Sequence, residues 1–463
     1  IGQVAVNEQI EKDLSNKFPM HRLLQGEVGS GKTVVALRAM LSVVDSGGQA
    51  ALLAPTEVLA QQHYRTITKL LGDLAMAGTL AGSEIGTAVE LLTGSLSTAE
   101  KKVIHAKLAS GQTGIVIGTH ALISDGVEFD DLGLVVVDEQ HRFGVEQRDA
   151  LRMKAKQPPH LLVMTATPIP RTVAMTVFGD LDISTLKELP SGRAAITTHV
   201  IPVLEKPHYL DRAWQRVKEE VAKGFQVYIV APRIENPNKK LTEREIIAAQ
   251  LLGEEFLDNE VMVAVEELAP ELARGALAGL KIAVLHGKQS SEVKDQTMSA
   301  FAAGQIQVLV ATTVIEVGVD VPNASMMVIM DADRFGVSQL HQLRGRVGRG
   351  SAPGLCLLVS GAPEDSPSMQ RLSAVAATLD GFELARIDLE QRKEGDVLGR
   401  SQSGGRSHLR LLKVLRDENL IDQARTVSVK LLQDDPELIN LPDLKNEVEK
   451  LKEDESARFM DKS

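Results

Sequence analysis

Residues 26–33 have the sequence GEVGSGKT, which matches the phosphate-binding loop pattern G-x-x-x-x-G-K-[ST]. The loop lies between an apolar strand end at Leu23-Leu24 and a helical pattern over residues 34–41. Glycines let backbone N–H groups turn toward phosphate oxygens, and the following helix presents the positive end of its dipole. We therefore expect a nucleoside triphosphate site, with Lys32 on the β- and γ-phosphates and Thr33 as a ligand of Mg²⁺. The loop residues expected to bind the nucleotide are Gly26, Gly29, Ser30, Gly31, Lys32 and Thr33.

Short apolar runs alternate with helical patterns along most of the chain. In the first half, runs typical of buried strands lie at residues 51–54, 114–117, 134–137 and 161–164. A second set lies at residues 226–230, 281–285, 308–311, 326–330 and 355–359. This alternation predicts an α/β protein in which two successive lobes each have a parallel sheet with helices on both faces.

Changes in composition predict the domain boundaries. The first lobe is expected over residues 1–190 and the second over residues 195–360, with a linker around Pro190-Ser191-Gly192. Residues 236–279, rich in Glu, Ala and Leu, are interpreted as a helical insertion in the second lobe. The remainder, 361–463, has no strand pattern and is predicted to be helical apart from a glycine-rich stretch.

Length and composition exclude several classes of protein. The chain has 463 residues, enough for about three folding units. Its hydrophobic fraction of 43% and charged fraction of 24% are typical of a globular protein. The single cysteine, Cys356, cannot form an internal disulfide, which favours a reducing compartment. There is no apolar stretch of about 18 residues and no signal-peptide pattern, so we expect a cytoplasmic protein, and the start at Ile1 is consistent with a fragment.

A pair of acidic residues supplies a second part of the nucleotide site. The apolar run at residues 134–137 is followed by Asp138-Glu139-Gln140-His141. Ligands of open α/β sheets bind at the carboxyl ends of the strands. We expect Asp138 to hold the metal ion, directly or through water, and Glu139 to position and deprotonate the attacking water. Solvated turn residues are the alternative, and the phosphate-binding loop upstream favours the catalytic interpretation.

An arginine-rich segment supplies a third part. Residues 342–349 have the sequence QLRGRVGR, which is too rich in glycine to predict a stable helical face. Placed across a cleft between the lobes, Arg346 and Arg349 are expected to stabilise charge on the transferring phosphoryl group. Such an arginine is worth about 10³–10⁵ in rate in related chemistry. Surface salt bridges are the alternative.

Together these motifs resemble the superfamily 2 helicases and translocases. The resemblance also rests on APTE (54–57), LTGS (92–95), GTH (118–120), TATP (165–168), LHGK (285–288) and ATTVIEVGVDVP (311–322). It implies two tandem RecA-like P-loop lobes, with nucleotide contacts from Gly318 and Asp320. It also implies nucleic-acid backbone contacts or coupling roles for Pro55, Thr56, Thr93, Gly94, Thr119, His141, Thr165, Thr167, His286, Gly287, Thr312 and Thr313. Hydroxyls and backbone N–H groups contact phosphates without selecting bases, which suits movement through any sequence.

The segment after the second lobe is similar to the translocation motif of the RecG family of bacterial branch-migrating DNA helicases. The similarity rests on FPMHRLLQ (18–25), RFG (334–336), DGFELA (380–385), Asp388-Leu389, Arg392, Gly395-Asp396, Leu398-Gly399 and Gln402-Ser403-Gly404. In that family a helical hairpin and loop convert cleft closure into a stroke on duplex DNA, which implies roles for Arg392 and Gln402. Lys393-Glu394 departs from the expected Gly-Pro. Gln3 stands where the family has a glutamine that contacts adenine.

The resemblance implies an ATP-dependent DNA translocase that reverses stalled forks and migrates four-way junctions in repair and recombination. ATP and Mg²⁺ are the expected cofactors. Branched double-stranded DNA and single-strand DNA-binding protein are the expected partners of a monomer in the bacterial nucleoid, with no membrane attachment. The net charge of −11 argues against indiscriminate adhesion to nucleic acid but allows a local basic groove. The family's fork-splitting wedge domain has no counterpart in the sequence, so we expect weak fork binding by this chain alone.

Several alternatives stay open. A transcription-repair coupling translocase shares the translocation motif and differs upstream of the motor. A nucleic-acid-binding module with an idle ATP site would not need Lys32, Glu139 and Arg349 together. His141 couples the acidic loop to the second lobe or simply packs, and His286 contacts DNA or serves a turn. No Cys/His spacing predicts a zinc site.

Overall fold

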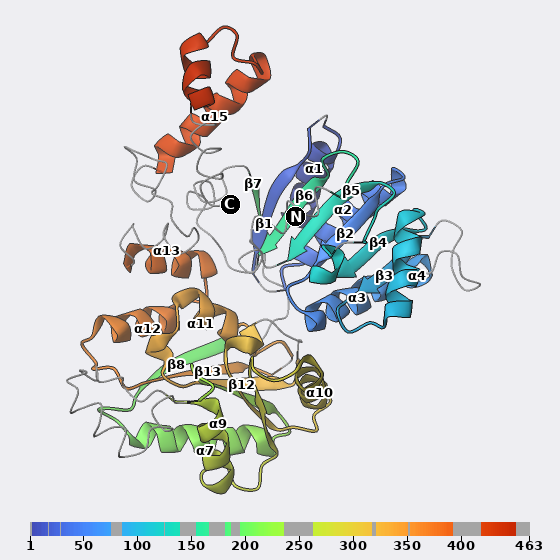
Figure 1. Ribbon diagram of the computed structural model, residues 1–463. Helices are drawn as coiled ribbons and strands as arrows, with labels where there is room; N and C mark the ends of the chain where they lie inside the picture. Colours follow the sequence, from blue (N-terminus) through green and yellow to red (C-terminus); the bar gives the residue numbers. More distant parts are fainter. Residues whose placement is uncertain are drawn as a thin grey trace, which may run out of the picture. The chain divides into compact units, whose positions relative to one another are not determined.

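The structure is a computed structural model that describes residues 2–16, 18–27, 29–75, 86–124, 126–138, 154–165, 181–186, 195–235, 263–316, 321–350, 352–391 and 418–450. The chain divides into two compact units. The first comprises residues 1–169 and 181–391 and holds two parallel sheets with their helices (Figure 1). The second comprises residues 170–180 and 392–463 and includes the helix α15 (Glu418–Asp434).

The first lobe is built on a seven-stranded sheet with the order β3-β4-β2-β5-β6-β1-β7. Every described pairing in it is parallel. Its strands are β1 (His21–Gly26), β2 (Gln49–Leu53), β3 (Ala88–Leu92), β4 (Thr113–Gly118), β5 (Leu132–Asp138), β6 (His160–Thr165) and β7 (Asp182–Leu186). The four apolar runs of the first half lie in β2, β4, β5 and β6, so the parallel α/β prediction is confirmed.

Three helices of the first lobe share one core with one face of this sheet. They are α1 (Gly2–Leu14), α2 (Lys32–Asp45) and α3 (Glu57–Leu71). Residues such as Ile10, Met40 and Ile67 pack there with Leu52 and Val136 from the strands. The helix α4 (Thr98–Ala109) packs against β3 and β4. Burial of this apolar face therefore fixes α1 and α2 beside the strand that leads into the phosphate-binding loop.

The second lobe has a six-stranded parallel sheet with the order β10-β11-β9-β12-β13-β8. Its strands are β8 (Ile196–Pro202), β9 (Gln226–Val230), β10 (Ile282–Leu285), β11 (Val308–Ala311), β12 (Ala324–Ile329) and β13 (Gly354–Ser360). One face is covered by α7 (His208–Ala222) and α9 (Val265–Arg274). The other is covered by α10 (Ser291–Ala302), α11 (Val337–Arg344), α12 (Pro367–Ala377) and α13 (Gly381–Gln391).

Helices from two other predicted segments, 236–279 and 361–463, pack into the core of this lobe. The helix α9 lies in the segment interpreted as an insertion, but Val265 and Leu272 belong to the core against the sheet. The first compact unit also continues to residue 391, past the boundary expected at 361. The physical reason is burial, because Leu372 on α12 and Leu384 on α13 pack into the same core as the strands.

Three strands are not predicted by the sequence, namely β3, β7 and β8. Each lies at an edge of its sheet. Edge strands bury only part of their side chains, and the strictly alternating start of β8 shows this pattern. The prediction rests on continuous apolar runs, which mark strands buried on both faces.

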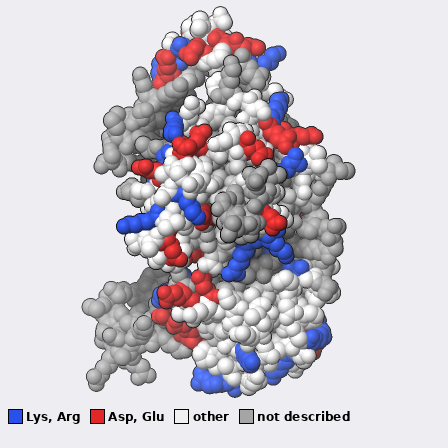
Figure 2. All heavy atoms as spheres, turned by 90° about the vertical axis from the view of Figure 1, so that its right-hand side faces the viewer, with Lys and Arg blue, Asp and Glu red and all other residues white. Residues whose placement is uncertain are grey.

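The described surface carries both signs of charge. Figure 2 shows acidic and basic side chains interspersed on one face of the molecule, which agrees with a modest net charge of −11 for the chain. Within the described ranges, no helix is long and apolar enough to cross a membrane.

Candidate functional site

The phosphate-binding loop connects β1 to α2 and needs its glycines. Gly29 and Gly31 have φ angles of 87° and 90°, in the left-handed region that favours glycine. A Cβ atom on Gly26 would lie 2.8 Å from Oγ of Ser30 and 2.9 Å from the carbonyl oxygen of Leu186. The conformation of the loop therefore explains why these three positions are glycine.

Two side chains contact the backbone of this loop. Nζ of Lys32 donates hydrogen bonds to the carbonyl oxygens of Gly26 at 2.8 Å and Glu27 at 3.0 Å. Nε2 of Gln3, on α1, donates to the carbonyl oxygen of Ser30 at 2.9 Å. The residue predicted to contact adenine thus lies against the loop predicted to hold the phosphates.

The loop has the features that a polyphosphate requires. Oγ of Ser30 is buried and has no hydrogen-bond partner among the described residues, so a phosphate oxygen would satisfy it. Lys32 begins α2 and Thr33 follows in its first turn, where backbone N–H groups and the helix dipole favour an anion. These residues fit a nucleoside triphosphate.

Asp138 lies at the same edge of the sheet, at the end of β5. The strand β6 separates β5 from β1, which places Asp138 about 10 Å from β1 across two strand spacings. Thr165 ends β6, is 2% exposed and pairs with Gln25, directly ahead of the loop. The sheet therefore brings the predicted metal ligand and the predicted coupling threonine next to the nucleotide loop.

A histidine that the sequence did not single out holds Asp138. Nε2 of His63 lies 2.7 Å from Oδ2 of Asp138, and both side chains are nearly buried. His63 occupies the inner face of α3, where a helical pattern looks the same for a packing residue as for a functional one. No sequence signal distinguishes it.

Asp138 and Thr33 are the residues that would hold Mg²⁺. Carboxylate and hydroxyl oxygens suit this ion, which usually takes one or two protein ligands and completes its shell with phosphate oxygens and water. No cluster of three or more His, Cys, Asp or Glu side chains that could hold a metal occurs in the described part of the chain.

The arginine-rich segment is partly helical. The helix α11 runs to Arg344 and ends at Gly345, so residues 342–344 are helical where no stable helix was expected. The first glycine of the segment, Gly345, stands where the helix ends, so the glycines do not interrupt the helix. Arg346 and Arg349 follow the helix and are half-buried, and Nε of Arg349 donates to the carbonyl oxygen of Gly345 at 2.8 Å.

The helix α11 contacts the phosphate-binding loop directly. Nε2 of His341 lies 3.0 Å from Oε2 of Glu27, and the exposed fractions of the two side chains are only 10% and 13%. Glu27 belongs to the first lobe and His341 to the second, so the loop and the helix that leads into the arginine segment meet across the two lobes. Neither residue was predicted to be functional, although Glu27 lies inside the loop motif and His341 directly precedes the arginine motif.

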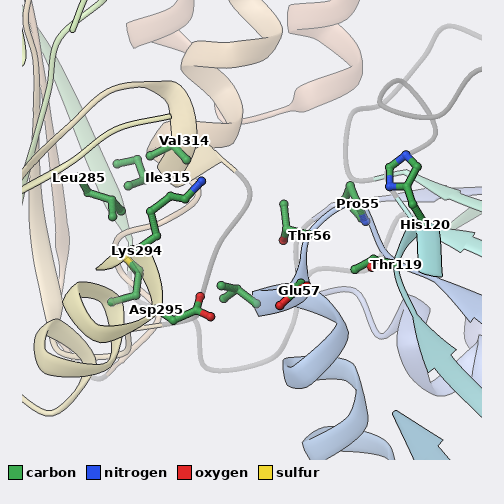
Figure 3. Close-up of a pocket in the computed structure, with 12 residues that line it drawn as sticks. Pro55, Thr56, Glu57, Thr119, His120, Leu285, Lys294, Asp295, Val314 and Ile315 are labelled. Carbon is green, nitrogen blue, oxygen red and sulfur yellow. The ribbon is translucent and has the colours of Figure 1, made fainter. Parts of the chain in front are cut away.

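A cavity of about 310 Å³ lies between the lobes at a different place (Figure 3). The first lobe contributes Pro55, Thr56, Glu57, Val58, Thr119 and His120, and the second contributes Leu285, Lys294, Asp295, Met298, Val314 and Ile315. Three residues predicted to contact nucleic acid, Pro55, Thr56 and Thr119, therefore share one wall.

Four other predicted contact residues, Thr93, Gly94, Thr312 and Thr313, lie next to residues that line the cavity. Ser95 N donates to Oε1 of Glu57 at 3.1 Å, which places the Thr93-Gly94 loop beside the cavity wall. In the second lobe, Thr312 N donates to the carbonyl oxygen of Leu285 at 3.1 Å, and Thr313 begins a short 3₁₀ turn.

His286 makes contacts within its own lobe. It is 7% exposed, its Nε2 lies 3.2 Å from Oε1 of Glu266, and its backbone N–H donates to the side chain of Gln289. These contacts fit the turn interpretation, and the predicted DNA contact stays a prediction. Gly287 has open space where a Cβ atom would stand, so packing does not require glycine there.

Two carboxylates oppose each other across the interlobe cavity. In Figure 3, Glu57 on α3 and Asp295 on α10 lie on opposite walls. Burial, and secondly the charge of Glu57, raise the pKa of Asp295 above its ordinary value. Its Oδ1 is buried and has no hydrogen-bond partner among the described residues. The ionised form of Asp295 is therefore disfavoured in this arrangement.

We expect Asp295→Asn to raise the melting temperature at pH 8. A raised carboxyl pKa means that the folded state prefers the protonated form, so stability decreases as pH rises through that pKa. The amide removes this cost, and its advantage should shrink as the pH falls toward 4, because the native carboxyl takes up its proton as the pH falls through that pKa. Calorimetry at both pH values measures the difference, with Glu292→Gln on the exposed side of α10 as control. A pH-independent difference would contradict this explanation.

Seven predicted site residues lie outside the described part of the chain, and their predicted roles stay predictions. They are Glu139, His141, Thr167, Gly318, Asp320, Arg392 and Gln402.

Three family models match the chain in order. The DEAD/DEAH box helicase model covers residues 5–176, and the helicase conserved C-terminal domain covers residues 213–351. The model "ATP-dependent DNA helicase RecG, domain 3, C-terminal" covers residues 378–458, the segment interpreted as a translocation motif. The chain is similar to the RecG helicases over both lobes and over the segment that follows them. The DEAD/DEAH box and C-terminal helicase matches support the prediction of an enzyme with two RecA-like lobes that uses a nucleotide.

Curated RecG helicases align over most of this chain. The Mycobacterium tuberculosis protein is 56% identical over 431 residues, which is 93% of this chain and 57% of the relative. The Bacillus subtilis protein is 43% identical over 434 residues, which is 94% of this chain and 58% of the relative. The chain thus spans little more than half the length of these RecG proteins.

Two solved structures are similar to this chain in fold. A structure described as RecG bound to a three-way DNA junction matches with a TM-score of 0.68 and 37% identity, covering 91% of this chain and 50% of the other. Yeast Dbp5 bound to RNA and ADP BeF3 matches with a TM-score of 0.53 and 17% identity, covering 85% of this chain and 93% of the other. At that low identity the Dbp5 match shows the shared two-lobed fold alone.

Proposed function

We propose that this chain is the motor of an ATP-dependent DNA translocase that remodels branched DNA, reversing stalled forks and migrating four-way junctions. The proposal rests on the order in which the parts of the chain follow one another. A complete phosphate-binding loop in one lobe meets the helix of the arginine motif in the other through Glu27 and His341, and a RecG-type C-terminal domain follows. Hydrolysis of one bound nucleotide can thus affect both lobes and be transmitted to the C-terminal domain that follows them.

The proposed chemistry divides among residues of both lobes. Lys32 and the N–H groups of the loop bind the phosphates, and Asp138 with Thr33 holds the metal ion. Mg²⁺, when bound, neutralises charge on the phosphate oxygens. Glu139 orients and deprotonates the attacking water, while Arg346 and Arg349 stabilise charge on the transferring phosphoryl group. The site is complete only when the lobes close, so hydrolysis and release alternate with lobe movement.

In this proposal the motor tracks DNA through contacts with the phosphate backbone. The threonines beside the interlobe cavity and in neighbouring loops offer hydroxyl and N–H donors, which bind phosphates in any sequence. A C-terminal element that pulls duplex DNA through a fork would make the parental strands re-pair, and this extrudes a four-way junction.

A transcription-repair coupling translocase remains a less supported alternative. It would share the motor and the translocation motif, but the curated relatives at 43–56% identity are RecG helicases and the C-terminal family model is that of RecG. The proposal further includes a monomeric state, single-strand DNA-binding protein as a partner and location at the bacterial nucleoid, all of which rest on the family resemblance.

A comparison of DNA substrates tests the proposed function. ATP hydrolysis and strand exchange are measured with the full-length protein on forked, linear and single-stranded DNA of matched length. We expect forks to stimulate hydrolysis most and to be converted to four-way junctions only with ATP. Equal stimulation by all three substrates without junction formation would contradict the proposal.

Substitution of the predicted stroke residues should uncouple hydrolysis from movement. Because Arg392 and Gln402 are assigned to the translocation motif and not to the nucleotide site, we expect Arg392→Ala or Gln402→Ala to lower fork reversal by about an order of magnitude while ATP turnover changes far less. Parallel assays of phosphate release and junction formation measure the two effects. An equal loss of both activities would argue against the assignment.

A further inference from the structure

The side chain of Glu27 binds two elements that lie far from it in sequence. Its Oε2 lies 3.0 Å from Nε2 of His341 on α11, and its Oε1 accepts a hydrogen bond from the backbone N–H of Gly381 at 3.1 Å. Gly381 is the first residue of α13. A carboxylate is stabilised at a helix N-terminus, where N–H groups and the helix dipole favour negative charge. Glu27 thus holds the start of α13 and the middle of α11 with one carboxylate.

The backbone of Glu27 is held by the side chain of Lys32, the lysine of the phosphate-binding loop. Nζ of Lys32 donates to the backbone carbonyl oxygen of Glu27 at 3.0 Å and to that of Gly26 at 2.8 Å. An ammonium group has only three donors, and phosphate oxygens are stronger acceptors than backbone carbonyls. When Lys32 turns to the phosphates of a bound nucleotide, Glu27 loses a backbone contact that holds it in this position.

The corner between α12 and α13 is anchored to the same cluster. Nη1 of Arg344 donates to the carbonyl oxygens of Val375 at 2.6 Å and Thr378 at 2.8 Å, and Nη2 lies 3.0 Å from Nδ1 of His341. Arg344 is 2% exposed, so these bonds form away from water and depend on one another. A shift at Glu27 therefore reaches the corner by two routes, through His341 and Arg344 and through the Gly381 N–H.

We propose that Glu27 is a positioning residue that couples nucleotide binding in the loop to the position of α13. The inference rests on the proposed function, because α13 ends at Gln391, directly before the predicted stroke residue Arg392. Without nucleotide, Lys32 and Glu27 hold the start of α13 against the loop. With nucleotide, the loop rearranges around the phosphates, the carboxylate bonds to His341 and Gly381 loosen, and α13 is released to move.

Hydrogen exchange tests the contact without relying on activity. In the full-length protein, a non-hydrolysable ATP analogue should raise amide exchange about tenfold in the peptide that covers residues 378–385, the effect of losing a hydrogen bond to a charged group. Glu27→Ala should show the raised exchange without nucleotide and no further response. Glu205→Ala is the matched control, because Oε1 of Glu205 accepts a backbone N–H from Glu364 within the second lobe.

The coupling ratio, junctions formed per ATP hydrolysed, gives a second readout. Glu27→Ala and His341→Ala should each lower it about tenfold. His341→Ala removes the same contact from the second lobe and leaves the loop sequence intact. It therefore tests the role of the contact even if Glu27→Ala binds ATP poorly. Glu27→Gln keeps an oxygen for the Gly381 N–H and should retain most of the coupling.

The results that would overturn this inference differ from those that would contradict the proposed function. Wild-type protein that hydrolyses ATP on forks without forming junctions would contradict the function. Wild-type protein that forms junctions, with an unchanged ratio and unchanged exchange in both Glu27→Ala and His341→Ala, would overturn only the role of Glu27.

Discussion

Glu139→Gln should bind ATP as tightly as the wild-type protein and hydrolyse it about 10²–10⁴ times more slowly, the range that a general base contributes. Asp138 ends β5 and is held by His63 beside the nucleotide loop, and Glu139 follows it directly in the sequence. The amide keeps the size and polarity of the side chain but cannot accept the proton of the attacking water.

Two measurements check this expectation. Equilibrium binding of a fluorescent ATP analogue reports affinity, and phosphate release on forked DNA reports turnover. Glu128→Gln, an exposed acidic residue in the same lobe, is the control and should behave as wild type. Wild-type turnover in Glu139→Gln would remove the assigned role of this residue.

Arg349→Ala should lower turnover by about 10³-fold or more while ATP affinity changes little, because its charge is needed mainly when negative charge builds up on the transferring phosphoryl group. Arg349 follows α11, the helix whose His341 contacts Glu27 of the phosphate-binding loop. The contact places this helix beside the phosphate-binding loop of the other lobe. Binding of the fluorescent ATP analogue and phosphate release on forked DNA separate the effect on affinity from the effect on turnover.

Arg274→Ala is the matched control for this experiment. Arg274 is exposed on α9 in the same lobe, and its Nε donates to the carbonyl oxygen of Pro270 in its own helix. We expect wild-type kinetics from it. If Arg349→Ala instead raised KM alone and left kcat unchanged, Arg349 would bind the ground state and the proposed charge stabilisation would be wrong.

The interior strands of the two sheets could be predicted from sequence, whereas three of their four edge strands could not. Strands buried on both faces, such as β2 and β11, appear as uninterrupted apolar runs, and the glycines of residues 26–33 identify the turn between β1 and α2. The edge strands β3, β7 and β8 mix polar and apolar residues and resemble loops. The packing of α12 and α13 against the second sheet was not predicted either, because the buried side of an amphipathic helix is identified only by the sheet that it covers.

The residues of the candidate site also form two groups, those that the sequence predicted and those that only the structure identifies. Glycines with positive φ, Lys32 and Asp138 belong to motifs whose spacing is set by the chemistry of phosphate and metal binding. His63, His341 and the carboxylate of Glu27 act through partners up to 354 residues away in the chain, as in the bond from Glu27 to Gly381. Long-range partners of single polar residues leave no local pattern, so only the folded structure brings them together.

We propose that nucleotide hydrolysis at the two-lobed site drives movement along duplex DNA. Displacement of a third strand from a short triplex, placed downstream of a fork on an otherwise plain duplex, measures this movement without strand separation. We expect ATP-dependent displacement by the full-length wild-type protein and none by Glu139→Gln. A third strand that stays bound while the wild-type protein hydrolyses ATP on the same DNA would contradict it.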